Sequence, residues 1–153
     1  LDRVKNLHGN VFPNLSFLIP NFIVVDGRRV SGMMLRHWQP MGPDKVQVWS
    51  WHLVERNAPD WWKRLGQKMY VQTFGMSGMF DQDDTENWEA QTRNSSSALW
   101  RRDEVMLHYA MGISAEPLDD FSGPGDVYDG KFSEAAGRTF YRTWLDLLLD
   151  ERG

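Results

Sequence analysis

The run from Lys45 to Arg56 constrains the fold most, because its side chains alternate with the two-residue period of a β-strand. One face of such a strand would carry Val46, Val48, Ser50, His52 and Val54. The opposite face would carry Gln47, Trp49, Trp51, Leu53 and Glu55. Because large side chains occur on both faces, we expect this strand to be covered on both sides.

Extended segments precede this run and are separated by turn signals. Residues 10–19 and 21–26 are rich in β-forming side chains. Asp26-Gly27 is a strong turn signal, so we predict a hairpin over residues 21–38. A second turn is expected at residues 39–44, which contain two prolines and a glycine. This order of strands and turns predicts an antiparallel meander.

Two helices are predicted after the meander. Asn57-Ala58-Pro59 would open the first, because proline is favoured at an early helical position, and the apolar pattern continues to about residue 74. Gly75 and Gly78 would interrupt it. The second helix is predicted from about Met79 to Arg93.

The C-terminal third predicts a strand, an irregular segment and a helix. Residues 98–111 are interpreted as a long strand that returns to the sheet, and residues 117–130 as irregular chain rich in Gly, Pro and Asp. Ser133 would cap a final helix from Glu134 to Asp150. Its apolar side chains stand at helical spacing and should pack against the sheet: Phe140, Trp144, Leu147 and Leu148. The complete order predicts an α+β domain.

Composition excludes several classes of protein. The 153 residues suffice for one domain, and a net charge of −4 does not favour nucleic acid or an anionic membrane. The absence of cysteine excludes disulfides, thiolate nucleophiles and cysteine-based zinc or iron–sulfur sites within the chain. No apolar run approaches about 20 residues, so we expect a soluble protein. The first residue is Leu1 rather than methionine, and we expect a piece of a longer protein.

Five acidic residues fall within nine positions, at 81, 83, 84, 86 and 89. Such a cluster often only marks a helix N-terminus and faces solvent. On a helix, however, Asp84 would share a face with Phe80 and Trp88, with Asn87 beside it. A carboxylate on an aromatic face needs a partner in the interior, either a metal ion or a buried arginine.

Several motifs then resemble one family, in its order. Phe-Gly-x-x-Gly-x-Phe-x-Gln-Asp-Asp-x-Glu-Asn-Trp at residues 74–88 resembles the signature of the large (alpha) subunit of Rieske-type aromatic-ring-hydroxylating dioxygenases. His8-Gly-Asn-Val-Phe-Pro-Asn14 resembles its pocket-lining strand, and residues 38–43 and 46–51 match its hairpin. The resemblance is strong over about the first 93 residues and weaker beyond. It implies that residues 1–153 are the C-terminal part of the catalytic domain, of helix-grip (START-like) fold, with an antiparallel sheet packed on a long C-terminal helix.

The resemblance also implies a mononuclear non-haem Fe(II) site. Asp84 corresponds to the carboxylate of a facial triad of two histidines and one carboxylate, which leaves coordination positions open for dioxygen. Asp83 projects about 100° away on a helix and cannot easily share the metal. Substrate-pocket positions of the family are matched by His8, Asn10, Phe74 and Phe80. Residues expected to surround and support the ligand are Asp83, Asn87 and Trp88.

Cofactors and partners follow from the same resemblance. The family's alpha subunit carries a Rieske [2Fe–2S] domain with two Cys and two His ligands, and a His-x₄-His pair holds the mononuclear iron. This sequence contains neither, so we expect both to lie outside it and the chain alone to be inactive. Electrons would pass from NAD(P)H through a reductase, with or without a ferredoxin, to an α3 or α3β3 assembly in the bacterial cytoplasm. The reaction would be dioxygen insertion into an aromatic substrate, by cis-dihydroxylation or hydroxylation.

Two other interpretations are open. A non-catalytic module of the same fold would bind a hydrophobic ligand, and it predicts an apolar or arginine partner for Asp84 and no converging histidines. A structural domain with a trimer interface predicts that four indoles are exposed: Trp49, Trp51, Trp61 and Trp62. The sequence does not fix the substrate. Arg36 or His37 could receive a substrate carboxylate, or could equally face water.

Overall fold

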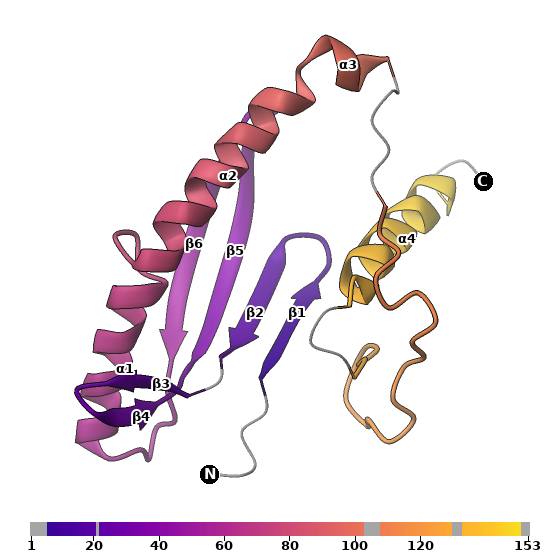
Figure 1. Cartoon of the computed structure of the whole chain (residues 1–153). Helices are drawn as coiled ribbons and strands as arrows, with labels where there is room; N and C mark the ends of the chain where they lie inside the picture. The colour runs from indigo at the N-terminus through magenta and orange to yellow at the C-terminus, as the bar shows by residue number, and fades with distance from the viewer. Residues whose placement is uncertain (1–5, 21, 103–107, 130–132, 151–153) are drawn as a thin grey trace. The chain divides into compact units, whose positions relative to one another are not determined.

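A four-stranded antiparallel sheet lies in the N-terminal part of the chain (Figure 1). The structure is a computed structural model that describes residues 6–20, 22–102, 108–129 and 133–150. In spatial order, the strands are β1 (Leu7–Val11), β2 (Leu15–Ile19), β5 (Met33–Gly42) and β6 (Lys45–Leu53). Each strand pairs antiparallel with its neighbour, as predicted, but the extended segment expected over residues 10–19 is divided by a turn at residues 12–14 into β1 and β2.

The turn between β5 and β6 is shorter than the predicted one at residues 39–44. β5 continues to Gly42 and β6 begins at Lys45, so only Pro43 and Asp44 connect them. The pairing register shifts between Pro40 and Gly42. A bulge of this kind accommodates a proline within a strand, because proline has no N–H to give to the ladder.

A second, two-stranded sheet is inserted between β2 and β5. It consists of β3 (Ile23–Val25) and β4 (Arg28–Val30), joined at Asp26-Gly27, where both residues have positive φ. The predicted turn is therefore confirmed, but a single hairpin over residues 21–38 is wrong. The chain leaves β4 at Ser31, whose Oγ donates to the carbonyl of Pro20 at 2.9 Å, before β5 begins.

Two helices follow the sheet, as predicted: α1 (Asp60–Thr73) and α2 (Met79–Ser95). Met69 of α1 is fully buried against Val25 and Val30 of the small sheet. The glycines between the helices are sterically required. A Cβ at Gly78 would lie 2.4 Å from the carbonyl oxygen of Thr73, so only glycine allows this tight connection.

The predicted strand over residues 98–111 is wrong. Its start forms a short helix, α3 (Ala98–Arg101), in which the backbone N–H of Trp100 donates to Oγ of Ser97 at 3.4 Å. Residues 103–107 lie outside the described residues, and residues 108–110 are irregular. The N-cap at Ser97 is the local interaction that overrides the β-forming character of this segment.

Within the described residues of the first unit, only one face of β6 is covered, and cover of its tryptophan-bearing face stays a prediction. Trp49 and Trp51 remain 52% and 43% exposed. The opposite face does contact α1, because Tyr70 donates through its hydroxyl to Oγ of Ser50 at 2.7 Å and stacks on His52. Helix α1 therefore covers one face of this edge strand only.

The chain divides into two compact units, Leu1–Val105 and Met106–Gly153, which we describe separately. The second contains α4 (Ala135–Asp150), close to the predicted final helix. The Ser133 Oγ accepts from the backbone N–H of Ala135 at 3.2 Å, as a capping residue does. Packing of α4 on the sheet stays a prediction.

Together the antiparallel sheet and the helices, including a C-terminal one, give an α+β fold. No helix in the described ranges is long and apolar enough to span a membrane.

Candidate active site

Asp84 lies in the second turn of α2, and its side chain is exposed. Its carboxylate makes no hydrogen bond or ion pair with any described residue. Asp83 and Asn87 are exposed as well, whereas Trp88 is half-buried. The interior partner expected for Asp84 is therefore not supplied by the described residues.

Helix α2 is joined to the sheet by an ion pair that the sequence did not predict. The guanidinium of Arg36 on β5 pairs with the carboxylate of Asp81 in the first turn of α2. Its Nη2 also donates to the carbonyl of Phe74 at 3.3 Å. Arg36 is thus occupied by the protein, in contrast to the sequence-based options of binding a substrate carboxylate or facing water.

An aromatic contact joins the same helix to the same face of β5, two residues after Arg36. Trp38 of β5 packs edge-to-face on Trp88 of α2, with 5.0 Å between ring centroids. The indole Nε1 of Trp38 donates to Oγ of Ser16 at 2.8 Å. The second candidate for a substrate carboxylate, His37, instead has its Nε2 3.0 Å from Nδ2 of Asn14.

Strand register places His8 and Asn10 on the same side of the sheet as these contacts. His8 pairs with Leu18, and Asn10 pairs with Ser16, which in turn pairs with Arg36. Residues directly opposite each other in antiparallel strands share a face. Both β1 side chains are exposed. The structure therefore puts His8 and Asn10 on the sheet face that α2 contacts.

The other two predicted pocket residues meet at the connection between α1 and α2. The rings of Phe74 and Phe80 have centroids 5.1 Å apart and are tilted by 45°. Phe74 is half-buried and Phe80 is 41% exposed. This pair packs on itself while keeping one ring open to solvent, and no ring contact joins it to His8 in the described chain.

Known proteins match the chain in sequence and in fold. Residues 2–150 match the family described as ring hydroxylating alpha subunit (catalytic domain). The chain belongs to this family. It is 34% identical over 141 residues to N,N-dimethyl phenylurea N-demethylase subunit alpha of Sphingobium sp. (strain YBL2), which covers 92% of this chain and 30% of that protein. It is 32% identical over 141 residues to chlorobenzene dioxygenase subunit alpha of Cupriavidus sp. (strain PS12), with 92% and 28% covered.

The fold of this ring-hydroxylating alpha-subunit chain agrees with a solved relative. The structure of naphthalene 1,2-dioxygenase from Rhodococcus sp. bound to indole superposes with a TM-score of 0.81 and 40% identity. The match covers 97% of this chain and 34% of that one. The chain spans about 30% of the length of the curated relatives named above.

Ring-hydroxylating alpha subunits use a mononuclear iron and a Rieske cluster. The Rieske cluster does not fit this chain, because the sequence has no cysteine to ligate it. Within the described ranges, no group of three or more His, Cys, Asp or Glu could hold a metal ion. Asp84 fits the role of a single iron ligand, since its exposed carboxylate has both oxygens available.

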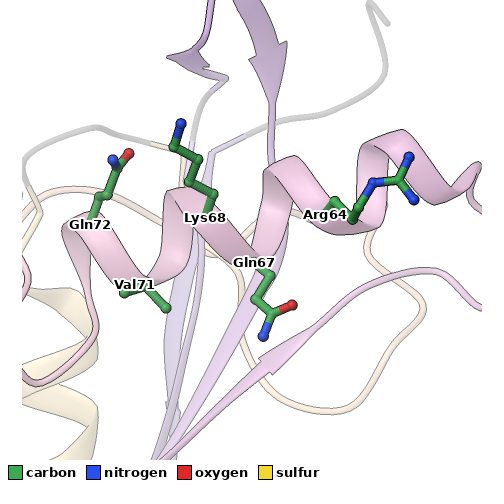
Figure 2. Close-up of a pocket in the computed structure, with 5 residues that line it drawn as sticks. All are labelled: Arg64, Gln67, Lys68, Val71 and Gln72. Atoms are coloured by element: carbon green, nitrogen blue, oxygen red, sulfur yellow. The ribbon is translucent and has the colours of Figure 1, made fainter.

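A surface hollow elsewhere on the first unit is not part of this site. Figure 2 shows the five α1 residues that line it: Arg64, Gln67, Lys68, Val71 and Gln72. The ammonium of Lys68 pairs with the Asp26 carboxylate at 2.8 Å. None of the predicted site residues lines this hollow.

Proposed function

We propose that this chain contributes one carboxylate ligand, Asp84, to the mononuclear iron of a ring-hydroxylating oxygenase. When bound, the iron would supply the activation of dioxygen for insertion into an aromatic substrate. The reaction would be cis-dihydroxylation or hydroxylation. The chain alone would be inactive, because its described residues bring no further ligands to Asp84.

One observation carries the proposal. Asp84 has a carboxylate without a partner among the described residues, and its helix is held against the sheet both before and after Asp84 along the chain. Asp81, three residues before Asp84, pairs with Arg36. Trp88, four residues after Asp84, packs on Trp38. Residues three and four apart share a helix face. Asp84 is therefore held on the side of the sheet that carries His8, where a metal and an aromatic substrate could meet.

The remaining residues take roles that match their surroundings. His8 and Asn10 would contact the substrate, and the Phe74–Phe80 pair would bound its ring. Asp83 and Asn87 are exposed neighbours of Asp84 on α2 and would orient its carboxylate. Trp88 would act by fixing the helix, since its ring packs on Trp38.

Substrate and partners belong to the same proposal. The relatives' names specify neutral aromatic compounds, N,N-dimethyl phenylurea and chlorobenzene. We infer an aromatic small molecule and dioxygen as substrates. Electrons would arrive from NAD(P)H through a reductase, with or without a ferredoxin, and a Rieske cluster outside this chain. The assembly would be α3 or α3β3, in the cytoplasm of a bacterium.

A structural role at a trimer interface has one observation in its favour. Of the four indoles that it predicts to be exposed, Trp49, Trp51 and Trp61 are more than one-third exposed, whereas Trp62 is half-buried. This role is compatible with the oxygenase proposal. The ligand-binding module without a metal predicts an apolar or arginine partner for Asp84, but Arg36 pairs with Asp81 instead.

Iron analysis of the complete subunit that carries this chain tests the proposal. Asp84→Ala should abolish iron binding in the mononuclear site together with substrate oxygenation. Glu89→Ala is the matched control, since it removes an exposed carboxylate from the same helix and should leave iron in place. Products from chlorobenzene and N,N-dimethyl phenylurea, identified by mass spectrometry, would distinguish ring oxygenation from N-demethylation. Undiminished mononuclear iron in Asp84→Ala would refute the ligand assignment.

A further inference from the structure

The ion pair between Arg36 and Asp81 has the properties of a fixed anchor. The side chains of Arg36 and Asp81 are only 12% and 17% exposed. Shielding from solvent strengthens the attraction and reduces its sensitivity to salt, in contrast to an exposed pair. The same guanidinium also binds the carbonyl of Phe74, directly after the end of α1. One side chain of β5 therefore holds the end of α1 and the start of α2.

The aromatic anchor is fixed from the sheet side. The backbone N–H of Trp38 donates to the carbonyl of Asn14, and its indole Nε1 donates to Ser16, both at 2.8 Å. The guanidinium carbon of Arg36 lies 5.9 Å from the centroid of the Trp38 ring. The two anchors on β5 thus contact each other as well as α2.

Two anchors restrict a helix more than one does. A helix held only at Asp81 could rotate about its axis or pivot away from the sheet, and the contact at Trp88 prevents both. Asp84 lies between the anchors on the same face, three residues after one and four before the other. The Asp84 side chain itself makes no hydrogen bond or ion pair with the described residues.

We propose that Arg36 and Trp38 are positioning residues, which set the place and orientation of the Asp84 carboxylate through α2. This inference rests on the proposed function, in which Asp84 binds iron. Arg36 has a second effect, because it neutralises Asp81. Without the guanidinium, a free carboxylate would stand one helical turn from Asp84 and compete for the metal.

The test uses the complete subunit and replaces Arg36 by methionine, which keeps an apolar stem without the charge. We expect the affinity for Fe(II) at the mononuclear site to fall by about 10-fold or more, as is typical when a residue that orients a ligand is lost. The electron paramagnetic resonance signal of the nitric oxide complex of the iron should change its rhombicity. Lys68→Met is the matched control, because it removes a lysine from an exposed ion pair of the same unit.

Further variants separate positioning from simple stabilisation. Arg36→Lys keeps the charge and should recover part of the affinity. Trp38→Leu should lower the Fe(II) affinity, and Trp38→Phe should lower this affinity less. Arg36→Lys and Trp38→Phe also supply the comparison if the larger changes prevent folding. A lower thermal midpoint with unchanged Fe(II) affinity and an unchanged resonance signal would show a structural role only and overturn the proposal.

Asp84→Ala in the same assay distinguishes the two hypotheses. Suppose that Asp84→Ala loses iron while the Arg36 and Trp38 variants keep a normal Fe(II) affinity and resonance signal. The positioning role is then refuted, and the assignment of Asp84 as a ligand stands. If Asp84→Ala keeps its iron, the ligand assignment fails and the positioning role fails with it.

Discussion

The imidazole of His52 on β6 stacks on the phenol ring of Tyr70 on α1, with 5.2 Å between centroids and 12° between the ring planes. Its Nε2 is buried and has no hydrogen-bond partner among the described residues. Burial lowers the pKa of His52 below its ordinary value of 6.5. The folded protein therefore favours a neutral imidazole at the contact between α1 and the sheet.

Acid should weaken this contact. Unfolded His52 binds a proton more readily than folded His52, so its contribution to stability is complete above the unfolded pKa near 6.5 and is lost as the pH falls below it. We expect amide exchange of residues 60–73, corrected for intrinsic rates, to be faster at about pH 5.5 than at about pH 7.5. His52→Gln, which does not titrate, should remove this difference. The same acceleration in that variant would contradict the assignment to His52.

Gly32 should be intolerant of any side chain. A Cβ there would lie 2.4 Å from Nε2 of His52, so Gly32→Ala must displace the imidazole or the strand. We expect a loss of about 1–3 kcal/mol in the free energy of unfolding, measured by urea denaturation. Gly27→Asn is the control, because nothing lies within 4 Å and asparagine tolerates its φ of +72°. A change below about 0.5 kcal/mol is expected for the control.

Arg138 should hold the start of α4 to the preceding loop. Its guanidinium donates to the carbonyls of Tyr109, Met111 and Gly112, all within 2.9 Å. Arg138→Met should make residues 109–113 exchange faster and become sensitive to protease. The expected cost is at the low end of about 1.5–3 kcal/mol, because water can solvate the freed carbonyls. Arg142→Met, one turn further along α4, should have no such effect, and equal effects of both variants would argue against the three hydrogen bonds.

In the proposed pocket, Phe80 should affect the rate and the products of substrate oxygenation. Phe80→Ala removes the ring that packs on Phe74. The proposed contact of the Phe80 ring with an aromatic substrate would contribute about 0.5–1.5 kcal/mol beyond its buried area, so we expect kcat/KM to fall about 2- to 10-fold, with altered product ratios. Met76→Ala is the control, since Met76 is 94% exposed in the same connection. Identical kinetics of Phe80→Ala and the parent subunit would remove Phe80 from the pocket.

Local signals in the sequence predict most of the elements. Pro59, Gly75 and Gly78 mark helix ends through their own backbone preferences, so α1 and α2 are predictable. Pro40 of β5 misleads for the same reason, because the prediction of a turn does not include the bulge that pairing with β6 provides. At α3, the interpretation of residues 98–111 as a strand did not include the local cap that Ser97 provides to the helix.

The site is only partly predictable, because its contacts join distant segments. Helical phase places Asp84 beside Trp88, and the same rule would have added Asp81 to that face. The choice of Arg36 as its partner depends on the fold, since 45 residues separate the two. The motif identifies residues with candidate roles, whereas the anchoring of α2 is visible only in three dimensions.

Trp49 and Trp51, on the face of β6 that α1 does not cover, have an optical consequence. An indole in contact with water emits at longer wavelength than one enclosed by apolar groups. Any element or subunit that covers this face should therefore shift the emission of these two residues to shorter wavelength. Among the eight tryptophans of the sequence, a change in emission that Trp49→Phe and Trp51→Phe remove would thus report assembly without a label.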